Sequence, residues 1–332
     1  MDVAIIGCGR QGNRRARAIK ECGDKIIIAV DIVPEAAKAI AKEYGCEISD
    51  DWKSVIWDKR VEAVLVCTPN DTHASIAIAA LKAGKHVLCE KPLARNPKEA
   101  QTILDAAKKS RAMLKCGFNH RHHPAVMAAK KHIESGGVGK LLFMRCRYGM
   151  TGRNDYEKEW RADLSICGGG PMMDQGQHVV DLFRWFGGEF TEVTGATGTL
   201  YYKIKPIEDN AFAILHSKAG HMCMMHVDSI EWKNLFYLEV FGDKGYLKID
   251  GLGGSYGSEK LIFGDKDFYS PFSETVTEFN KDDISWRGEW NEFKSAISEK
   301  RTPLGSGEDG LAAVKVAYAV YESSEQGKAI KL

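Results

Sequence analysis

A glycine-rich turn near the amino end of the chain is the first group of residues with an evident chemical use. Gly7, Gly9 and Gly12 follow a short apolar run and precede a helix-like segment at residues 13–20. In this spacing the first glycine permits a tight turn, the second lets the backbone approach a pyrophosphate, and the third allows close packing of helix on strand. The phosphates then lie at the helix N-terminus. The motif therefore predicts dinucleotide binding.

Asp31 adds a second feature of the same kind of site. It ends the second apolar run, about 20 residues after the turn, where a carboxylate can accept hydrogen bonds from both adenine-ribose hydroxyls. The same charge would repel a 2′-phosphate, and Ile32 supplies no cation to offset it, so NAD is favoured over NADP. NADP stays open as an alternative, because Arg10 or Arg14 could reach a 2′-phosphate.

The composition limits the classes of protein to be considered. With 332 residues, 44% of them apolar and 27% charged, the chain is expected to fold as two globular domains. A net charge of +1 gives no overall field for nucleic acid or an anionic membrane, so neither partner is expected. The chain begins without a secretory signal, and no apolar stretch reaches the roughly 20 residues of a membrane span, which predicts a cytoplasmic protein. Its nine cysteines stand singly, as expected for reduced thiols.

The strands and helices that must position the glycine turn are expected to alternate regularly along the chain. Apolar runs at residues 3–6, 26–30, 63–67, 86–89 and 113–116 alternate with helix-like stretches such as 34–44 and 72–83. This pattern predicts an α/β Rossmann domain, a parallel sheet with helices on both faces, over residues 1–120.

Beyond residue 120 the strand-like runs come close together, at 141–148, 211–215, 221–227, 235–241 and 246–249. Their short connections favour a mainly antiparallel open sheet. Helix-like segments near 172–186 and 310–323 complete an α+β second domain, residues 121–332, for substrate binding and oligomerisation. The C-terminal helix is a candidate to pack back on the first domain.

Three longer motifs resemble one known family. They are AGKHVLCEKP at 83–92, preceded by Thr68, Asn70 and His73, then GFNHRHHP at 117–124, and GGGPMMDQGQHVVD at 168–181. Together they resemble the Gfo/Idh/MocA oxidoreductases, which include glucose-fructose oxidoreductase and inositol dehydrogenases. The resemblance covers most of the chain and is weakest after about residue 250. The cofactor-binding residues it implies, together with the turn, are Gly7, Gly9, Arg10, Gln11, Gly12, Asp31, Thr68, Asn70, His73, Glu90, Lys91 and Arg121.

The resemblance also implies a reacting site. Lys91 is expected near the nicotinamide and the reacting carbon, with Asp174 and His178 facing it from the second domain. Oxidation of a secondary alcohol needs a base for the hydroxyl proton and a group that stabilises the developing alkoxide. His178 suits the first role near neutral pH, and Lys91 the second, with a possible part in proton relay. Asp174 and His178 are four residues apart on a predicted helix and hence on one face.

Further substrate contacts are expected around these three residues. Arg121 could approach the nicotinamide amide or the substrate, and Trp160 with Arg161 could form a sugar-stacking and hydrogen-bonding wall, although an exposed loop anchor is an equal alternative. Asp181 is interpreted as a structural carboxylate. The expected substrate-binding residues are Lys91, Arg121, Tyr148, Trp160, Arg161, Asp174 and His178.

No metal is expected. His120, His122 and His123 are clustered, but adjacent residues on one backbone rarely converge on one ion. The histidines and methionines of residues 221–226 could attract copper by ligand softness, yet their alternation is typical of a sheet strand.

The sequence thus predicts an NAD-dependent dehydrogenase or reductase acting on a CH–OH group of a sugar, cyclitol or nucleotide sugar, assembled as a homodimer or homotetramer. Alternatives are a glycoside-cleaving relative that oxidises its sugar only transiently, a regulatory NAD- or sugar-sensing protein without turnover, and a zinc-dependent dehydrogenase. The substrate, the oxidised carbon, the physiological direction and the release of NAD after each turnover stay open.

Overall fold

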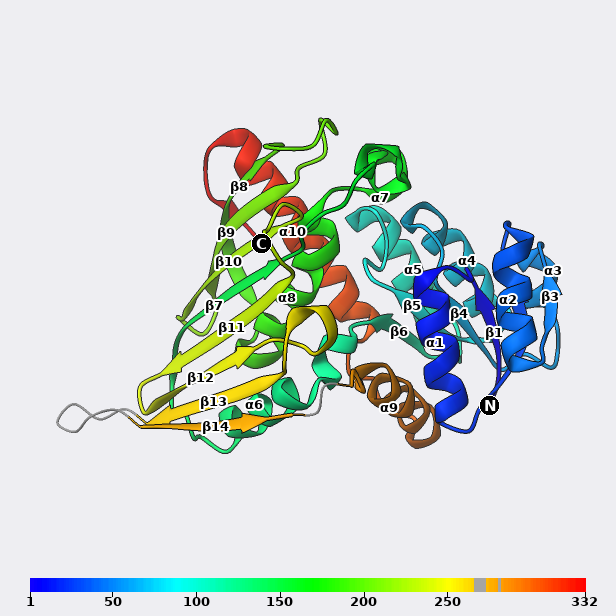
Figure 1. Cartoon of the computed structure of the whole chain (residues 1–332), viewed down its shortest axis with the longest axis horizontal. Coiled ribbons are helices and arrows are strands. Elements are labelled where there is room, and N and C mark those ends of the chain that lie inside the picture. Colours follow the sequence, from blue (N-terminus) through cyan, green and yellow to red (C-terminus); the bar gives the residue numbers. More distant parts are fainter. Residues whose placement is uncertain (266–272, 280–281) are drawn as a thin grey trace. The chain divides into compact units, whose positions relative to one another are not determined.

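The computed structural model describes residues 1–265, 273–279 and 282–332 (Figure 1). The chain forms two compact units. The first contains residues 1–119, 165–168 and 286–314, and the second contains 120–164, 169–285 and 315–332. The first unit thus includes two segments from beyond residue 120, residues 165–168 and 286–314.

The first unit is built on a six-stranded sheet in the order β3-β2-β1-β4-β5-β6. All its strand pairs are parallel, which confirms the Rossmann prediction. The central strand β4 is apolar and buried along its whole length, as expected where helices cover both faces of a parallel sheet. The strands are β1 (Asp2–Ile6), β2 (Lys25–Val30), β3 (Glu47–Ser49), β4 (Ala63–Val66), β5 (His86–Glu90) and β6 (Leu114–Gly117).

The helices of this unit begin where the sequence supplies caps. Asn96 accepts a hydrogen bond from the amide of Glu99 at the start of α5 (Pro97–Lys109), with proline at the first helical position, as predicted. The helix after the glycine turn, α1 (Arg10–Glu21), begins three residues earlier than expected. The others are α2 (Pro34–Tyr44), α3 (Trp52–Ile56) and α4 (Asn70–Lys82).

Helix α9 (Ser285–Glu299) explains why a late segment belongs to the first unit. Its Trp290 and Phe293 are buried in the same apolar cluster as Ile5 of β1 and Ile19 of α1. Periodicity in sequence cannot reveal such a long-range contact. Figure 1 shows α9 beside α1.

The second unit is built on a nine-stranded sheet in the order β14-β13-β12-β11-β7-β10-β9-β8-β15. The sheet is mainly antiparallel, as predicted, but β7 and β10 pair in parallel. Strands β8, β13, β14 and β15 were not predicted. The strands are β7 (Leu141–Gly149), β8 (Phe190–Gly198), β9 (Asn210–Ser217), β10 (Met222–Asp228), β11 (Leu235–Gly242), β12 (Gly245–Asp250), β13 (Lys260–Asp265), β14 (Glu274–Glu278) and β15 (Ile330–Lys331).

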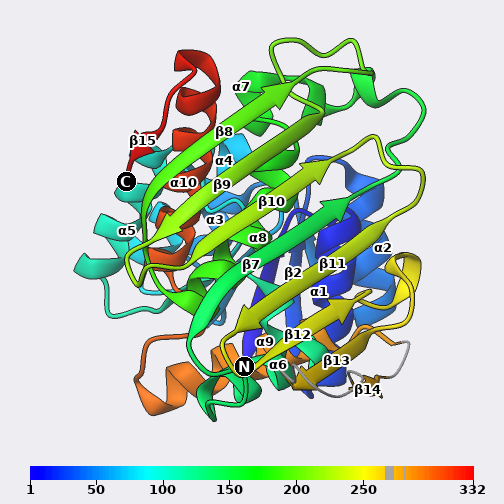
Figure 2. The ribbon, with the colours of Figure 1, turned by 90° about the vertical axis from the view of Figure 1, so that its left-hand side faces the viewer.

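Helices cover one face of this sheet. Helix α8 (Pro171–Gly187) packs on β7, β9 and β10, and α6 (Pro124–Glu134) packs on β12 and β13. Along β9 and β10, buried residues alternate with residues of the other face, and Figure 2 shows that face without a covering helix. The unit also contains the 3₁₀ turns η2 (Tyr156–Lys158), η3 (Trp160–Ala162) and η4 (Gly254–Tyr256), together with all of η1 (Asn119–His122) except Asn119. The residues of two helices are divided between the units, those of the short α7 (Leu164–Cys167) and of α10 (Gly307–Gln326).

Within the described residues, none of the helices has the length and apolarity required to cross a membrane. All nine cysteines are free thiols.

Candidate active site

The three glycines of the turn differ in the space that surrounds them. Gly7 has a φ of +95°, and a Cβ there would lie 2.6 Å from the carbonyl carbon of Cys67. A Cβ on Gly12 would lie 2.1 Å from the carbonyl oxygen of Gly7. At Gly9, by contrast, a Cβ would meet nothing within 4 Å. Gly7 and Gly12 are therefore required by the fold, whereas Gly9 leaves open space at the N-cap of α1, where a pyrophosphate would fit.

Asp31 holds the end of β2 to this turn. Its carboxylate accepts hydrogen bonds from the amide of Cys8 at 2.6 Å and from the amide of Val33 at 2.8 Å. Each carboxylate oxygen has a second lone pair, so the group can still accept from ribose hydroxyls. Arg10, which precedes Gln11 on α1, is exposed.

Glu90 lies in a buried network of charges. Its Oε1 accepts a hydrogen bond from Nε of Arg15 at 2.8 Å, and Arg15 also donates to Glu289 of α9. Lys115 lies 3.3 Å from Glu292. Burial raises the pKa of Glu289, and the cations Arg15 and Lys115 oppose that rise. Since Glu90 is buried and bound to Arg15, it fixes the end of β5, directly before Lys91, against the cofactor helix.

His73 and Asn70 also hold backbone segments in place. The Nδ1 of His73 lies 2.9 Å from the carbonyl oxygen of Pro92, and its Nε2 lies 2.9 Å from that of Thr68. Burial lowers the pKa of His73, which has 0% exposure. Asn70 donates a hydrogen bond to the carbonyl oxygen of Cys167 at 2.8 Å. These side chains would shape the loops after β4 and β5, and Lys91 on the second loop is half-buried.

Helix α8 carries Asp174 and His178 on one face, as their spacing predicts. Its N-terminus is held by Glu208, whose carboxylate accepts from the amides of Gly170 at 3.0 Å and Met172 at 2.9 Å. Burial raises the pKa of Glu208, while these donors oppose the rise. No motif pointed to Glu208, because an acidic residue in a loop gives no signal of the helix that it caps.

Arg161 lies beside Asp174. Its guanidinium stacks over the ring of Trp160, 4.2 Å from the ring centroid, and its Nε is 3.8 Å from Oδ2 of Asp174. Both members of the charged pair are about one-third exposed, at 31% and 35% of their side-chain surfaces. The structure thus brings Arg161 next to the expected catalytic carboxylate, with Trp160 packed against Arg161.

Arg121 has a structural partner. Its Nε and Nη2 donate to the two carboxylate oxygens of Asp181 at 2.8 and 2.6 Å. Both residues are buried, and such a two-bond geometry is rigid. Asp181 therefore has the structural role expected of it, and the pair fixes η1 to α8. Contact of Arg121 with cofactor or substrate stays a prediction.

The ring of His178 lies in an aromatic cluster. His120 stacks on it with a centroid separation of 3.7 Å and an interplanar angle of 20°. Tyr148 lies 6.3 Å from His178 and 5.3 Å from His120 between ring centroids, and burial raises its pKa well above the ordinary value. The clustering of three histidines in sequence suggested a role for His120 only as a metal ligand. The sequence feature that could have drawn attention to His120 is its place in the 117–124 motif. That motif does not reveal that His120 stacks on His178.

The histidines around η1 do not form a common ligand set in the described structure. His123 pairs with Glu259, whose Oε2 is 3.1 Å from Nδ1, while His120 faces His178. Elsewhere His226, Asp228 and Glu231 bring their ligand atoms within 4.8 Å of one another. Two of these side chains have structural partners: Nε2 of His226 lies 2.7 Å from the amide oxygen of Asn210, and Asp228 accepts a hydrogen bond from the amide of Ile230.

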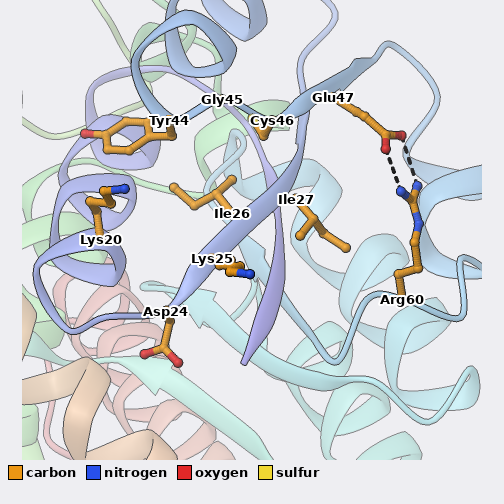
Figure 3. Close-up of a pocket in the computed structure, with 10 residues that line it drawn as sticks. All are labelled: Lys20, Asp24, Lys25, Ile26, Ile27, Tyr44, Gly45, Cys46, Glu47 and Arg60. Atoms are coloured by element: carbon orange, nitrogen blue, oxygen red, sulfur yellow. Dashed lines mark hydrogen bonds and ion pairs between the residues drawn. The ribbon is translucent and has the colours of Figure 1, made fainter.

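A hollow of about 400 Å³ lies elsewhere in the first unit, at the amino end of β2 (Figure 3). Its lining mixes both signs of charge, and Arg60 is paired with Glu47 at one side of it. Ligands of parallel sheets bind at the carboxyl ends of the strands, where the glycine turn lies. The hollow is therefore separate from the expected cofactor site.

Comparison with known proteins agrees with this geometry. Residues 1–118 match the family model described as "Oxidoreductase family, NAD-binding Rossmann fold", and residues 126–248 match the "GFO/IDH/MocA C-terminal domain". The chain is therefore an oxidoreductase with an NAD-binding Rossmann domain. It belongs to the Gfo/Idh/MocA family, as the motifs indicated.

Three relatives illustrate the range of similarity. The chain is 29% identical to myo-inositol 2-dehydrogenase of Thermotoga maritima over 352 aligned positions, which cover 100% of this chain and 98% of the relative. It is 42% identical to levoglucosan dehydrogenase of Pseudarthrobacter phenanthrenivorans over 169 residues, which cover 50% of this chain but only 43% of that relative. A solved levoglucosan dehydrogenase in complex with NADH and levoglucosan aligns with a TM-score of 0.93 and 25% identity, covering 100% of this chain and 99% of that one.

Proposed function

We propose that this protein oxidises a secondary alcohol of a sugar or cyclitol, with hydride passing to NAD, and that Lys91, Asp174 and His178 act on the reacting carbinol. The observation that carries the proposal is the arrangement on α8, where Asp174 and His178 share one face and Arg161 lies beside Asp174. The names of the inositol and levoglucosan dehydrogenases support the substrate class.

The residues of the glycine turn suit the cofactor. Gly9 leaves room above the N-terminus of α1, and Asp31 is a hydrogen-bond acceptor at the end of β2. When bound, NAD supplies the hydride acceptor. We propose that Asp31 selects NAD over NADP by repelling a 2′-phosphate.

Side chains of the protein carry out the proton transfer of the proposed reaction. His178 takes the hydroxyl proton through a ring nitrogen, because imidazole titrates near neutral pH. The ammonium group of Lys91 stabilises the oxygen as negative charge develops on it. Asp174 accepts a hydrogen bond from a neighbouring substrate hydroxyl, while Arg161 and Trp160 contribute a polar and an aromatic surface to the sugar ring.

We further propose that the protein self-associates through the uncovered face of its nine-stranded sheet. Phe212, Ile214, Met222 and Met224 are each between 45% and 50% exposed there, which is unusual for neighbouring large apolar residues. Sedimentation at micromolar concentration is expected to give a dimer or tetramer, and Ile214→Asp to shift it toward monomer. A monomeric wild-type protein would contradict this proposal of self-association.

Nine free thiols fit a reducing compartment such as the cytoplasm, which we propose as the location of the protein.

A substrate screen tests the proposed reaction. Sugars, sugar phosphates, nucleotide sugars and inositols are incubated with NAD and with NADP in parallel, and the reduced cofactor is followed by absorbance. Net formation of NADH with a free sugar or cyclitol is expected. Cleavage of a glycoside without net NADH would favour the glycoside-cleaving alternative, and a lack of turnover with all these compounds would contradict the proposal.

A further inference from the structure

We propose that His120 is a positioning residue for His178, whose ring it holds flat in the orientation needed for proton transfer. This inference rests on the proposed role of His178 as the base. His120 is not one of the three residues, Lys91, Asp174 and His178, to which the proposed reaction assigns a chemical role.

The two imidazoles form a close parallel stack. Their centroids lie 3.7 Å apart, and the ring planes differ by 20°. His120 is 6% exposed and His178 is 4% exposed, so protein atoms surround both. The rings come from separate elements, η1 and α8. The stack therefore fixes the His178 side chain from outside its own helix.

His120 is itself held by neighbours on other sides. Its ring packs edge-on against His123 at 5.4 Å and against Phe236 at 5.8 Å, and it lies 5.3 Å from Tyr148. His123 is tied in turn to Glu259, which also accepts a hydrogen bond from the amide of Ala125 at 2.6 Å. The position of the His120 ring is thus set by a packed frame rather than by a single contact.

Two physical effects follow from this stack. A flat ring against the face of His178 limits rotation of the imidazole, which keeps the nitrogen that accepts the proton aimed in one direction. An aromatic face also attracts the positive charge that His178 gains when it takes the proton. Both effects require a flat aromatic ring at position 120, and neither requires His120 to exchange protons.

The test compares replacements that keep or remove the ring. His120→Phe keeps a flat aromatic face, whereas His120→Leu fills the site without one and His120→Asn keeps a polar group without a ring. We expect Phe to retain kcat within about threefold, and Leu and Asn to lower it about tenfold to a hundredfold. KM for the substrate should change much less than kcat in all three.

A matched control is available in the same unit. His132 of α6 stacks on Phe263 with centroids 4.9 Å apart and an interplanar angle of 17°. His132→Leu removes a similar stack that does not involve His178, and it is expected to leave kcat unchanged. Melting temperature and NADH fluorescence titration check that every variant folds and binds cofactor.

The outcomes separate this inference from the proposed function. If Leu and Asn match wild type, or if Phe loses as much kcat as Leu does, the positioning role is wrong. His178→Asn is measured alongside. A large loss there with no loss in His120→Leu overturns only the role of His120, whereas unchanged kcat in His178→Asn overturns the assignment of the base.

Discussion

The two units surround their functional residues with opposite kinds of environment. In the first unit, Arg15 joins Glu90 and Glu289 in a buried ionic network next to the cofactor turn. In the second, His178 lies among the rings of His120 and Tyr148. Paired opposite charges hold a backbone rigidly, which suits recognition of an unchanging cofactor. Aromatic packing fixes the orientation of the His178 ring from outside its own helix.

Removal of Arg15 is expected to have the largest effect on stability. Arg15→Ala leaves Glu90 and Glu289 buried without their partner, which should lower the free energy of unfolding by about 3–5 kcal/mol. Chemical denaturation measures the loss. Arg17→Ala, which removes an exposed pair with Glu21 on the same helix, is the control and should change little. A small loss in both variants would mean that the network does not hold the unit together.

The glycines of the cofactor turn should separate folding from binding. Gly9→Ala has room for its methyl group, so its melting temperature should match wild type while the Kd for NADH rises about tenfold, about 1.4 kcal/mol. Gly12→Ala should instead unfold more easily, because its Cβ would collide with Gly7. Calorimetry and fluorescence titration distinguish the two. Unchanged NADH affinity in Gly9→Ala would contradict the proposed position of the pyrophosphate.

Asp228 offers a smaller, pH-dependent test in the second unit. Burial and the nearby Glu231 raise its pKa from 3.8 to about 6. The folded protein therefore binds a proton more tightly than the unfolded chain, so this group favours folding below pH 4 and loses that contribution as pH rises through about 6. Asp228→Asn should raise the free energy of unfolding by about 1 kcal/mol at pH 8 and have less effect at pH 4.5. An equal gain at both pH values would rule out titration as the cause.

The sequence predicts the cofactor half well because its signals are local. The glycine spacing, the capping Asn96 and the strand at 63–67 each depend on residues close together in the chain. Helix α9 joins the first unit through Trp290, far away in sequence, and no periodicity indicates that contact. The parallel pairing of β7 with β10 is hidden for the same reason.

Contacts between residues far apart in sequence also limit how much of the candidate site can be predicted. The family motifs name Asp174 and His178, but the side chains that hold them are non-local. Glu208 lies in a loop after β8 and caps α8, and Phe236, which packs edge-on against the His120 ring that stacks on His178, comes from β11. Arg121 illustrates the same point, since its place in a motif predicts ligand contact but does not reveal its pair with Asp181.

The central claim is that Lys91 acts in the reaction rather than in the fold or in cofactor binding. Single-turnover absorbance with excess enzyme, NAD and a substrate identified by the screen measures hydride transfer directly, in wild type and in Lys91→Met. We predict that Lys91→Met melts normally and binds NADH within about threefold of wild type, yet transfers hydride at least about a hundredfold more slowly. Hydride transfer at the wild-type rate in Lys91→Met would contradict the account.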